Sequence, residues 1–539
     1  MRTPHRRRHA RRAALLTTLA AVAVFAVACS SSSSKSKTST SDATSASADS
    51  GPATGVINWA YTTDQPNWDP VVVGATSATQ LLSTVYEPLF TLKPDGSLGP
   101  ALAESYKYNS TGDAVTITLK SGLTFQDGTP VNAQAVAFNV QRIQTQSNSA
   151  LKALWQDVAS ATVIDDTHVT LNLKSVDYQI PYILANRTSL LASPAAAADP
   201  TKLNTQAPVG AGPFKLVNYT PGSKITFEKW DGYWDAKDIH VKTVNIFLAV
   251  DASTLLSGLQ TGQYNFNPGL PLQDLTAAKA AGLKVVVDAA HGWGVTFLNL
   301  NTNVAPFTNP AVVKAVQLAI NRQQLVSQLS FGVGTVAYQP WPSISPLYNP
   351  TVDSSLFPYD PDKAKQVLQA AGIAPGSISL DLDYISSPVF TGAGELIQQQ
   401  LKAVGINVKL VTQQVNQFYG GFYANAQGKK TSAFTLYGWV GRDSKLAALD
   451  DQFSSTGILN LSAPSTSAGY AAQRSKVLQT PLDSPNYKSV LQAATLEAVQ
   501  GSSNIFLYSY PNVYVTGKGW SDFTKIDGSF RWNGLTVGS

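Results

Sequence analysis

Hydrophobic and polar positions along the chain predict a protein of mixed α/β structure. Alternating apolar residues predict short strands, and apolar residues spaced by three and four predict helices. The predicted strands are 55–60, 115–119, the arms of a hairpin within 163–173, 378–385, 406–411, 434–439 and 504–510. The predicted helices are 78–89, 132–141, 394–404 and 488–499, with further ones beginning after Asp251, Asn309 and Asp360.

Polar caps and glycines mark the ends of several predicted helices. Asn132, Asp251 and Asn309 are predicted N-cap residues, and Pro310 occupies a first helical position, where a missing N–H costs nothing. Asp360 and the proline after it repeat this arrangement, and Gly372 ends the helix that follows. The strand–helix–strand order from 378 to 411 predicts a parallel pair of strands.

One apolar stretch lies outside this pattern, at residues 13–29 behind an arginine-rich head. A basic head, a short apolar run and small residues at the end are typical of a secretory signal peptide, predicted at 1–28. The run is shorter than the roughly 20 residues of a comfortable membrane span. It ends at Cys29, the only cysteine of the chain.

Val27-Ala28-Cys29 resembles the lipobox of bacterial lipoproteins, whose cysteine receives a diacylglycerol and becomes the new N-terminus. Ala26 stands where that pattern prefers leucine. The alternative is an ordinary signal peptide with an accidental cysteine. Residues 30–54 are nearly all Ser, Thr, Ala, Lys and Asp, too polar to fold. We therefore predict a lipidated, disordered tether over 29–54 and a location on the extracytoplasmic face of the cell membrane.

Charge and length narrow the class of protein. The formal charge of +5 includes six arginines of residues 1–28, so the mature chain carries +5 − 6 = −1. The mature chain therefore lacks the basic charge that would indicate a nucleic-acid partner. The mature 539 − 28 = 511 residues are too many for one hydrophobic core, which predicts two or more domains. With Cys29 used at the anchor, the mature chain can form no internal disulfide.

Five sequence blocks resemble the peptide/nickel-binding family of solute-binding proteins, family 5, which serve ABC importers. They occur in the family's order between Ala103 and Gly372. One such block could be chance, whereas five in order are specific. The blocks are Ala103-Glu104-Ser105 with 115–142, then 208–235, 251–266, 297–326 and 357–372.

The resemblance implies a two-lobe, periplasmic-binding-protein-like α/β fold of class II, with three domains including an inserted one. Two chain crossings join the lobes, and hinge motion closes them around a ligand. The implied hinges lie near 296–301 and 502–504. The implied first lobe is 55–88, 207–295 and 504–539, the inserted domain is 89–206, and the second lobe is 296–503.

The resemblance also places a ligand site after the strand 434–439. Many peptide-binding relatives carry Trp-x-x-Asp there, and the Asp takes the ligand's α-ammonium. Here Trp439 matches the motif and Gly441 is a further candidate within the segment, but Arg442 occupies the Asp position and Asp443 follows. Asp443 could still reach the amine by a local shift. Alternatively, Arg442 binds a carboxylate or phosphate, for which its fork geometry is suited, or it pairs with Asp443.

Aromatic residues are further candidates for the pocket. Tyr437 precedes Trp439 by two residues and could share its face of the strand or belong to the core. Trp68, Trp293 and Trp341 lie in predicted loops near the lobe edges, where surface packing is the competing interpretation.

The sequence thus predicts a binding protein rather than an enzyme, with peptides of a few residues as cargo. A small anionic solute or a metal chelate is the alternative, motivated by Arg442. An exported hydrolase is disfavoured because no nucleophile–base pair can be named, and scattered histidines offer no metal-ligand spacing. A third interpretation, a surface sensor that takes no part in transport, stays open. Predicted partners are an ABC permease and its ATPase, for a monomer that needs no cofactor.

Overall fold

The computed structural model describes residues 53–61, 67–73, 78–199, 201, 203, 208–248, 250–291, 294–341, 343, 345–422, 430–441, 444–462, 466–526 and 529–538. The predicted signal peptide 1–28 and Cys29 lie outside these residues. The described strands form three larger sheets and two two-stranded ones. Among the described helices, none has both the length and the apolar character that crossing a bilayer requires.

The first large sheet contains seven of the described strands, in the order β12-β19-β11-β1-β10-β9-β8. Strand β1 has the predicted bounds and pairs in parallel with β10 and β11. The strands are β1 (Gly55–Ala60), β8 (Phe214–Thr220), β9 (Lys224–Lys229), β10 (Val241–Phe247), β11 (Phe266–Asn267), β12 (Lys284–Asp288) and β19 (Asn512–Thr516).

The second large sheet contains six described strands, in the order β14-β18-β13-β17-β15-β16. β15 and β16 are parallel in register from Ile378↔Ile406 to Ile385↔Gln413, which confirms the predicted parallel pair. The strands are β13 (Gly294–Leu300), β14 (Thr335–Val336), β15 (Ile378–Ile385), β16 (Ile406–Gln413), β17 (Phe434–Val440) and β18 (Ile505–Tyr510).

A four-stranded antiparallel sheet, in the order β4-β5-β7-β6, forms the centre of the predicted inserted domain, here called the insert (89–206). The β6–β7 hairpin turns as predicted, and alternate residues of β7 are buried. Its strands are β4 (Ala103–Tyr108), β5 (Ala114–Leu119), β6 (Val158–Val163) and β7 (His168–Leu173); the two-stranded sheets are β2 (Phe90–Leu92) with β3 (Leu98–Pro100) and β20 (Lys525–Ile526) with β21 (Ser529–Phe530).

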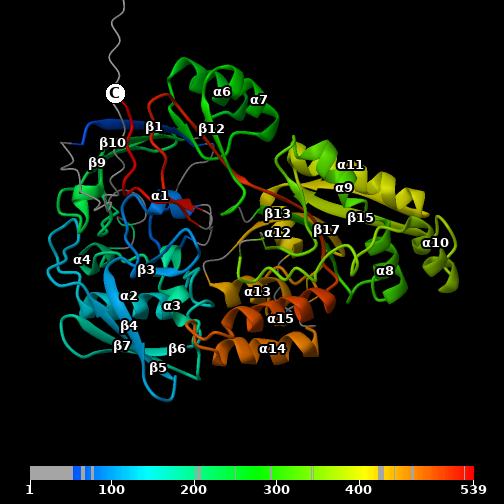
Figure 1. Ribbon diagram of the computed structural model, residues 1–539, viewed down its shortest axis with the longest axis horizontal. Coiled ribbons are helices and arrows are strands. Elements are labelled where there is room, and N and C mark those ends of the chain that lie inside the picture. Colours follow the sequence, from blue (N-terminus) through cyan, green and yellow to red (C-terminus); the bar gives the residue numbers. More distant parts are fainter. Residues whose placement is uncertain are drawn as a thin grey trace, which may run out of the picture. The chain divides into compact units, whose positions relative to one another are not determined.

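Helices cover these sheets, and those of the second lobe lie around its six-stranded sheet (Figure 1). The described α-helices are α1 (Thr79–Leu82), α2 (Ala133–Thr145), α3 (Ile180–Ile183), α4 (Pro194–Ala197), α6 (Ala252–Thr261), α7 (Leu275–Ala280), α8 (Pro310–Ala319), α9 (Arg322–Leu329), α10 (Pro361–Ala370), α11 (Pro388–Ala403), α12 (Val415–Phe422), α13 (Lys445–Phe453), α14 (Ala468–Gln479) and α15 (Tyr487–Gln500). Short 3-10 helices are η2 (Asn186–Ser189), η3 (Ala236–Asp238) and η4 (Leu272–Asp274).

The predicted caps are confirmed. The side chain of Asn132 accepts a hydrogen bond from the backbone N–H of Ala135 at 3.1 Å, and Asp360 accepts one from Lys363 at 2.8 Å. Asp251 and Asn309 cap α6 and α8 in the same way. These short polar side chains satisfy N–H groups that the first helical turn leaves without partners.

Two predicted helices have different bounds in the structure. The helix predicted at 78–89 is wrong beyond α1, because the hydroxyls of Ser83 and Thr84 bond back to the carbonyls of Gln80 and Leu81. Such local bonds compete with helix propagation. The helix predicted from 394 begins at Pro388 instead, since Ser387 supplies its N-cap and proline fits the first turn.

The chain leaves the first large sheet after β12, which ends at Asp288, and enters the second with β13, which begins at Gly294; it returns at Pro511, between β18 and β19. Strand β13 lies wholly in the second sheet, as does β18. The crossings therefore differ from the predicted hinges at 296–301 and 502–504, and β18 does not belong with the first lobe. Alternation of apolar residues identifies a strand but not the sheet it joins, which explains this difference. The remaining domain boundaries stay predictions.

Candidate functional site

The predicted site segment follows β17, which lies inside the second sheet between β13 and β15. Trp439 is 4% exposed and packs edge-on against Trp341, with ring centroids 5.6 Å apart. Tyr437 stacks on Phe418 at 5.6 Å. The structure thus brings Trp341 and Trp439 together, while Tyr437 packs within the aromatic layer beside them. Their contact with a ligand stays a prediction.

The other predicted site residues have different surroundings. Trp68 is buried in the core of the first lobe, where it packs on Phe227 at 5.6 Å, as the competing packing interpretation expects. Gly441 is buried directly after β17. Trp293, Arg442 and Asp443 lie outside the described residues.

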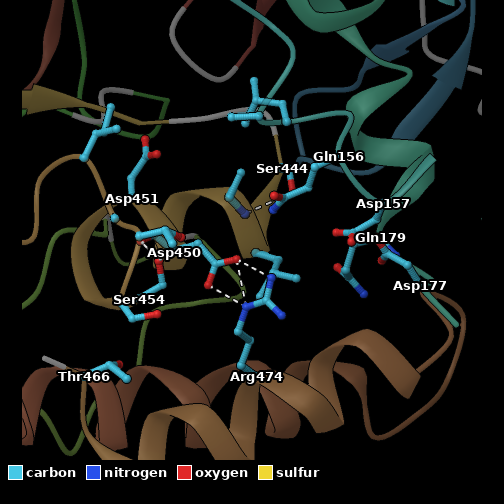
Figure 2. Close-up of a pocket in the computed structure, with 18 of the residues that line it drawn as sticks. Gln156, Asp157, Asp177, Gln179, Ser444, Asp450, Asp451, Ser454, Thr466 and Arg474 are labelled. Atoms are coloured by element: carbon cyan, nitrogen blue, oxygen red, sulfur yellow. Dashed lines mark hydrogen bonds and ion pairs between the residues drawn. The ribbon is translucent and has the colours of Figure 1, made fainter. Parts of the chain in front are cut away.

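Ser444, the next residue in the sequence after Asp443, lines a pocket of about 320 Å³. Ser444 is the N-cap of α13, and its hydroxyl accepts the backbone N–H of Ala447 at 3.2 Å. The second lobe lines one side of this pocket through α13, the loop after it and α14, and the insert lines the other side (Figure 2). Its polar lining includes Gln156, Asp157, Asp177, Gln179, Ser444, Asp450, Asp451, Ser454, Thr466 and Arg474.

Arg474 and Asp450 form an ion pair inside this pocket. The guanidinium of Arg474 reaches from α14 to Asp450 on α13 (Figure 2), and its Nε lies 2.8 and 2.9 Å from the two carboxylate oxygens. The hydroxyl of Tyr470 donates a further bond of 2.7 Å to the same carboxylate. Because this geometry is bidentate and charge-assisted, it fixes both side chains and joins α13 to α14.

Asp177 lies on the opposite, insert side and is 6% exposed. One carboxylate oxygen accepts the backbone N–H of Gln179 at 2.7 Å. Burial raises the pKa of Asp177 to about 6, the negative charges of Asp157 and Asp450 add to the rise, and Arg474 opposes it. A positively charged ligand group would relieve this cost of ionisation.

The lining of this pocket is acidic. Four aspartates and one arginine line the described part of the pocket, a formal charge of 1 − 4 = −3. Among its described lining residues there is no His, Lys or Cys to act as a base or nucleophile. The part of the chain that the structure describes also contains no group of three His, Cys, Asp or Glu arranged to hold a metal ion.

The sequence prediction missed the acidic side of the pocket. Asp157 and Asp177 come from the insert, whereas Asp450 and Arg474 come from helices almost 300 residues later. An aspartate in a loop carries no signal of burial by itself. A distant partner creates that burial, so only the tertiary structure shows it.

Comparison with known proteins identifies the family of this chain. The family described as "Bacterial extracellular solute-binding proteins, family 5 Middle" matches residues 97–460, more than half of the chain. The glutathione-binding protein GsiB of Salmonella typhi is 29% identical over 388 residues, covering 69% of this chain and 72% of that protein.

Two solved structures share the fold at low sequence identity. DppA from Helicobacter pylori, in complex with the peptide STSA, aligns with a TM-score of 0.77 at 20% identity, over 90% of this chain and 98% of that one. NikA from Brucella suis, in complex with Fe(III)-EDTA, gives 0.78 at 20% identity, over 90% and 100%. The predicted periplasmic-binding-protein-like fold of several domains is thereby confirmed, and this chain belongs to the family 5 bacterial extracellular solute-binding proteins.

Proposed function

We propose that this protein is the extracytoplasmic binding component of an ABC importer and that it captures short peptides carrying a positive charge. The observation that carries the choice of cargo is the pocket between the insert and the second lobe, with its four aspartates and one already paired arginine. A peptide's ammonium or basic side chain would face carboxylates there. A volume of about 320 Å³ lies at the lower end of small-ligand pockets.

The cargo is tested by calorimetry on the purified mature chain. We expect tripeptides with a lysine or arginine to bind about tenfold or more tightly than matched peptides with glutamine, a difference of ~1.4 kcal/mol. Glutathione, a tripeptide of net negative charge, should bind more weakly than either. Failure of every peptide to bind would overturn the proposal, and preference for glutathione would overturn its charge argument.

A second candidate function is capture of a small anionic solute or metal chelate, because Arg442 stands where relatives carry an aspartate. Two variants separate the candidates. Under the peptide proposal, Asp443→Ala weakens binding more than Arg442→Ala. Under the anionic alternative, Arg442→Ala weakens binding about tenfold or more, as expected for a charged contact of ~1.5–3 kcal/mol.

We also propose that Cys29 is lipidated and anchors a monomer that carries out no catalysis. The arginine-rich, apolar leader ending in Cys29 supports this anchor. Mass spectrometry of the mature N-terminus should find a diacylglycerol-modified cysteine, and Cys29→Ser should release the protein from the membrane fraction. An unmodified N-terminus at another residue would overturn the anchor and leave the cargo proposal intact.

A further inference from the structure

We propose that the insert latches directly onto the second lobe by capping the C-terminal end of helix α14, with Gln179 as the central residue. The inference rests on the proposed function only in that the latched form is the one that retains cargo. Residues 178 and 179 belong to the insert, whereas α14 and α15 belong to the second lobe. These helices lie beside the insert (Figure 1).

Two hydrogen bonds close the end of α14 from across the boundary. The backbone N–H of Tyr178 donates to the carbonyl of Leu478 at 2.9 Å. The side-chain amide of Gln179 donates to the carbonyl of Val477 at 3.0 Å. The last four carbonyls of a helix have no partner within it, so they need donors from elsewhere. Here the insert supplies donors to two of these carbonyls, although that of Val477 also accepts the backbone N–H of Thr480 at 3.3 Å.

The carbonyl oxygen of the Gln179 side chain also has a hydrogen-bond partner in the second lobe. The hydroxyl of Tyr487, at the start of α15, donates to its carbonyl oxygen at 2.7 Å. Gln179 is 2% exposed, so separation of the two surfaces would return both ends of its amide to water. A buried amide held at both ends requires one specific docking geometry.

The insert presents Gln179 from a fixed loop. Asp177 accepts the backbone N–H of Gln179 through its carboxylate, and its own carbonyl accepts the hydroxyl of Tyr108 on β4 at 2.7 Å. The latch residues therefore need little ordering when the lobes close, which lowers the entropic cost of closure.

Apolar and charged contacts surround the latch. Ile180 and Ile183 on α3 share one buried cluster with Leu491 on α15. The ammonium of Lys445 lies 5.7 Å from the ring centroid of Tyr182, within the range of a cation–π contact. Closure thus buries apolar surface as well as polar groups.

The latch favours the closed form before any cargo binds. A ligand shifts a two-state equilibrium only by its differential affinity for the two states. Contacts made by the protein itself in the closed form add to that bias and slow release. Loss of both Gln179 side-chain bonds should therefore accelerate cargo release about tenfold.

Three variants test the latch: Gln179→Ala, Tyr487→Phe and the matched control Gln144→Ala. Gln144 also donates its amide to a backbone carbonyl, that of Val158 at 2.7 Å, but within the insert. Tyr487 is not among the residues lining the pocket, so its variant acts without touching cargo there. Small-angle scattering of each ligand-free protein and stopped-flow dissociation of a bound lysine-containing tripeptide are the two measurements.

We expect Gln179→Ala to increase the ligand-free radius of gyration and to speed peptide release about tenfold. Tyr487→Phe should change both in the same direction by less, and Gln144→Ala should change neither. Unchanged radius and release rate in both latch variants, even with lowered melting temperatures, would mean a permanent interface and overturn the latch. If no peptide binds any variant, the proposed function fails, and the ligand-free scattering still decides the latch.

Discussion

The insert has two boundaries, and they are built differently. At its boundary with the first lobe, Arg142 on α2 pairs at 2.5 Å with Asp69, which is fully buried. The side-chain amide of Gln126 donates to the carbonyls of Phe214 at 2.8 Å and Gly212 at 3.2 Å. Here the buried charges are paired across the boundary, and the backbones are in close contact.

At its boundary with the second lobe, the insert instead borders a pocket. Asp177 and Asp157 face it from the insert, and Asp450 uses its arginine partner within its own lobe. Two hydrogen bonds that cross this boundary end on carbonyls of a helix terminus, which water can satisfy equally well, and a third joins the hydroxyl of Tyr487 to the side chain of Gln179. Apolar residues of the insert and of α15 also share one buried cluster at this second boundary. On the latch proposal, the first boundary is a permanent joint and the second is a separable, ligand-receiving surface.

Removing the buried pair should break the permanent joint with the largest effect. Asp69→Ala leaves Arg142 buried without its carboxylate, and we expect the free energy of unfolding to fall by about 3–5 kcal/mol. Urea denaturation at pH 7 measures this. Asp522→Ala, which removes the exposed pair with Lys284, serves as the control and should leave stability unchanged. Equal effects of the two variants would show that the buried pair does not stabilise the joint between the insert and the first lobe.

At the boundary that borders the pocket, the contribution to the free energy of unfolding should depend on pH. The pKa of Asp177 is raised by burial to about 6, so between about pH 4 and 6 the folded state binds more protons than the unfolded state. Stability contributed by protonated Asp177 is therefore present at low pH and is lost as pH rises through that window. Asp177→Asn should be more stable than the parent by about 3 kcal/mol above pH 6 and equal to it below pH 4.

Urea denaturation of the parent and of Asp177→Asn from pH 3.5 to 8 tests this, because their difference cancels the other titrating groups. A difference that is constant with pH would show that Asp177 is not held in a desolvated position. A difference of opposite sign would mean that a cation already compensates its charge.

Close backbone packing inside the first lobe, beside the permanent joint, should give an intermediate effect. A Cβ at Gly212 would lie 2.5 Å from the carbonyl carbon of Val85 and 2.7 Å from the backbone nitrogen of Tyr86. Because backbone atoms cannot move aside cheaply, Gly212→Ala should cost about 1–3 kcal/mol in unfolding free energy. Gly269→Ala is the control for space, because no atom lies within 4 Å of its Cβ and its φ is not positive. Gly212→Ala behaving like the parent would refute close packing there.

These features differ in how far the sequence predicts them. The caps at Asn132 and Asp360 and the β15–β16 pair were predictable because their physics is local. The sheet that β18 joins and the burial of Asp177 were not, because both depend on residues far away in the chain. The predicted segment 439–443 ends one residue before Ser444, which lines the pocket, but the opposite acidic wall comes from the insert and has no motif of its own.

The smallest effect separates the two causes that raise the pKa of Asp177. Burial is the main cause and the negative charge of Asp157 a lesser one. Asp157→Asn removes the charge while keeping the side chain's volume, so the stability difference that Asp177→Asn produces should lose only a small part of its amplitude, about 1.4 kcal/mol for each unit by which the pKa of Asp177 falls. Its upper midpoint should move down from about pH 6 by less than about one unit. Repeating the pH series in the Asp157→Asn background measures this shift. If the pH dependence disappeared in that background, repulsion between carboxylates rather than desolvation would dominate, and the pocket would be open to water. A small shift supports a dry acidic wall, the environment in which a cargo cation gains most from meeting Asp177.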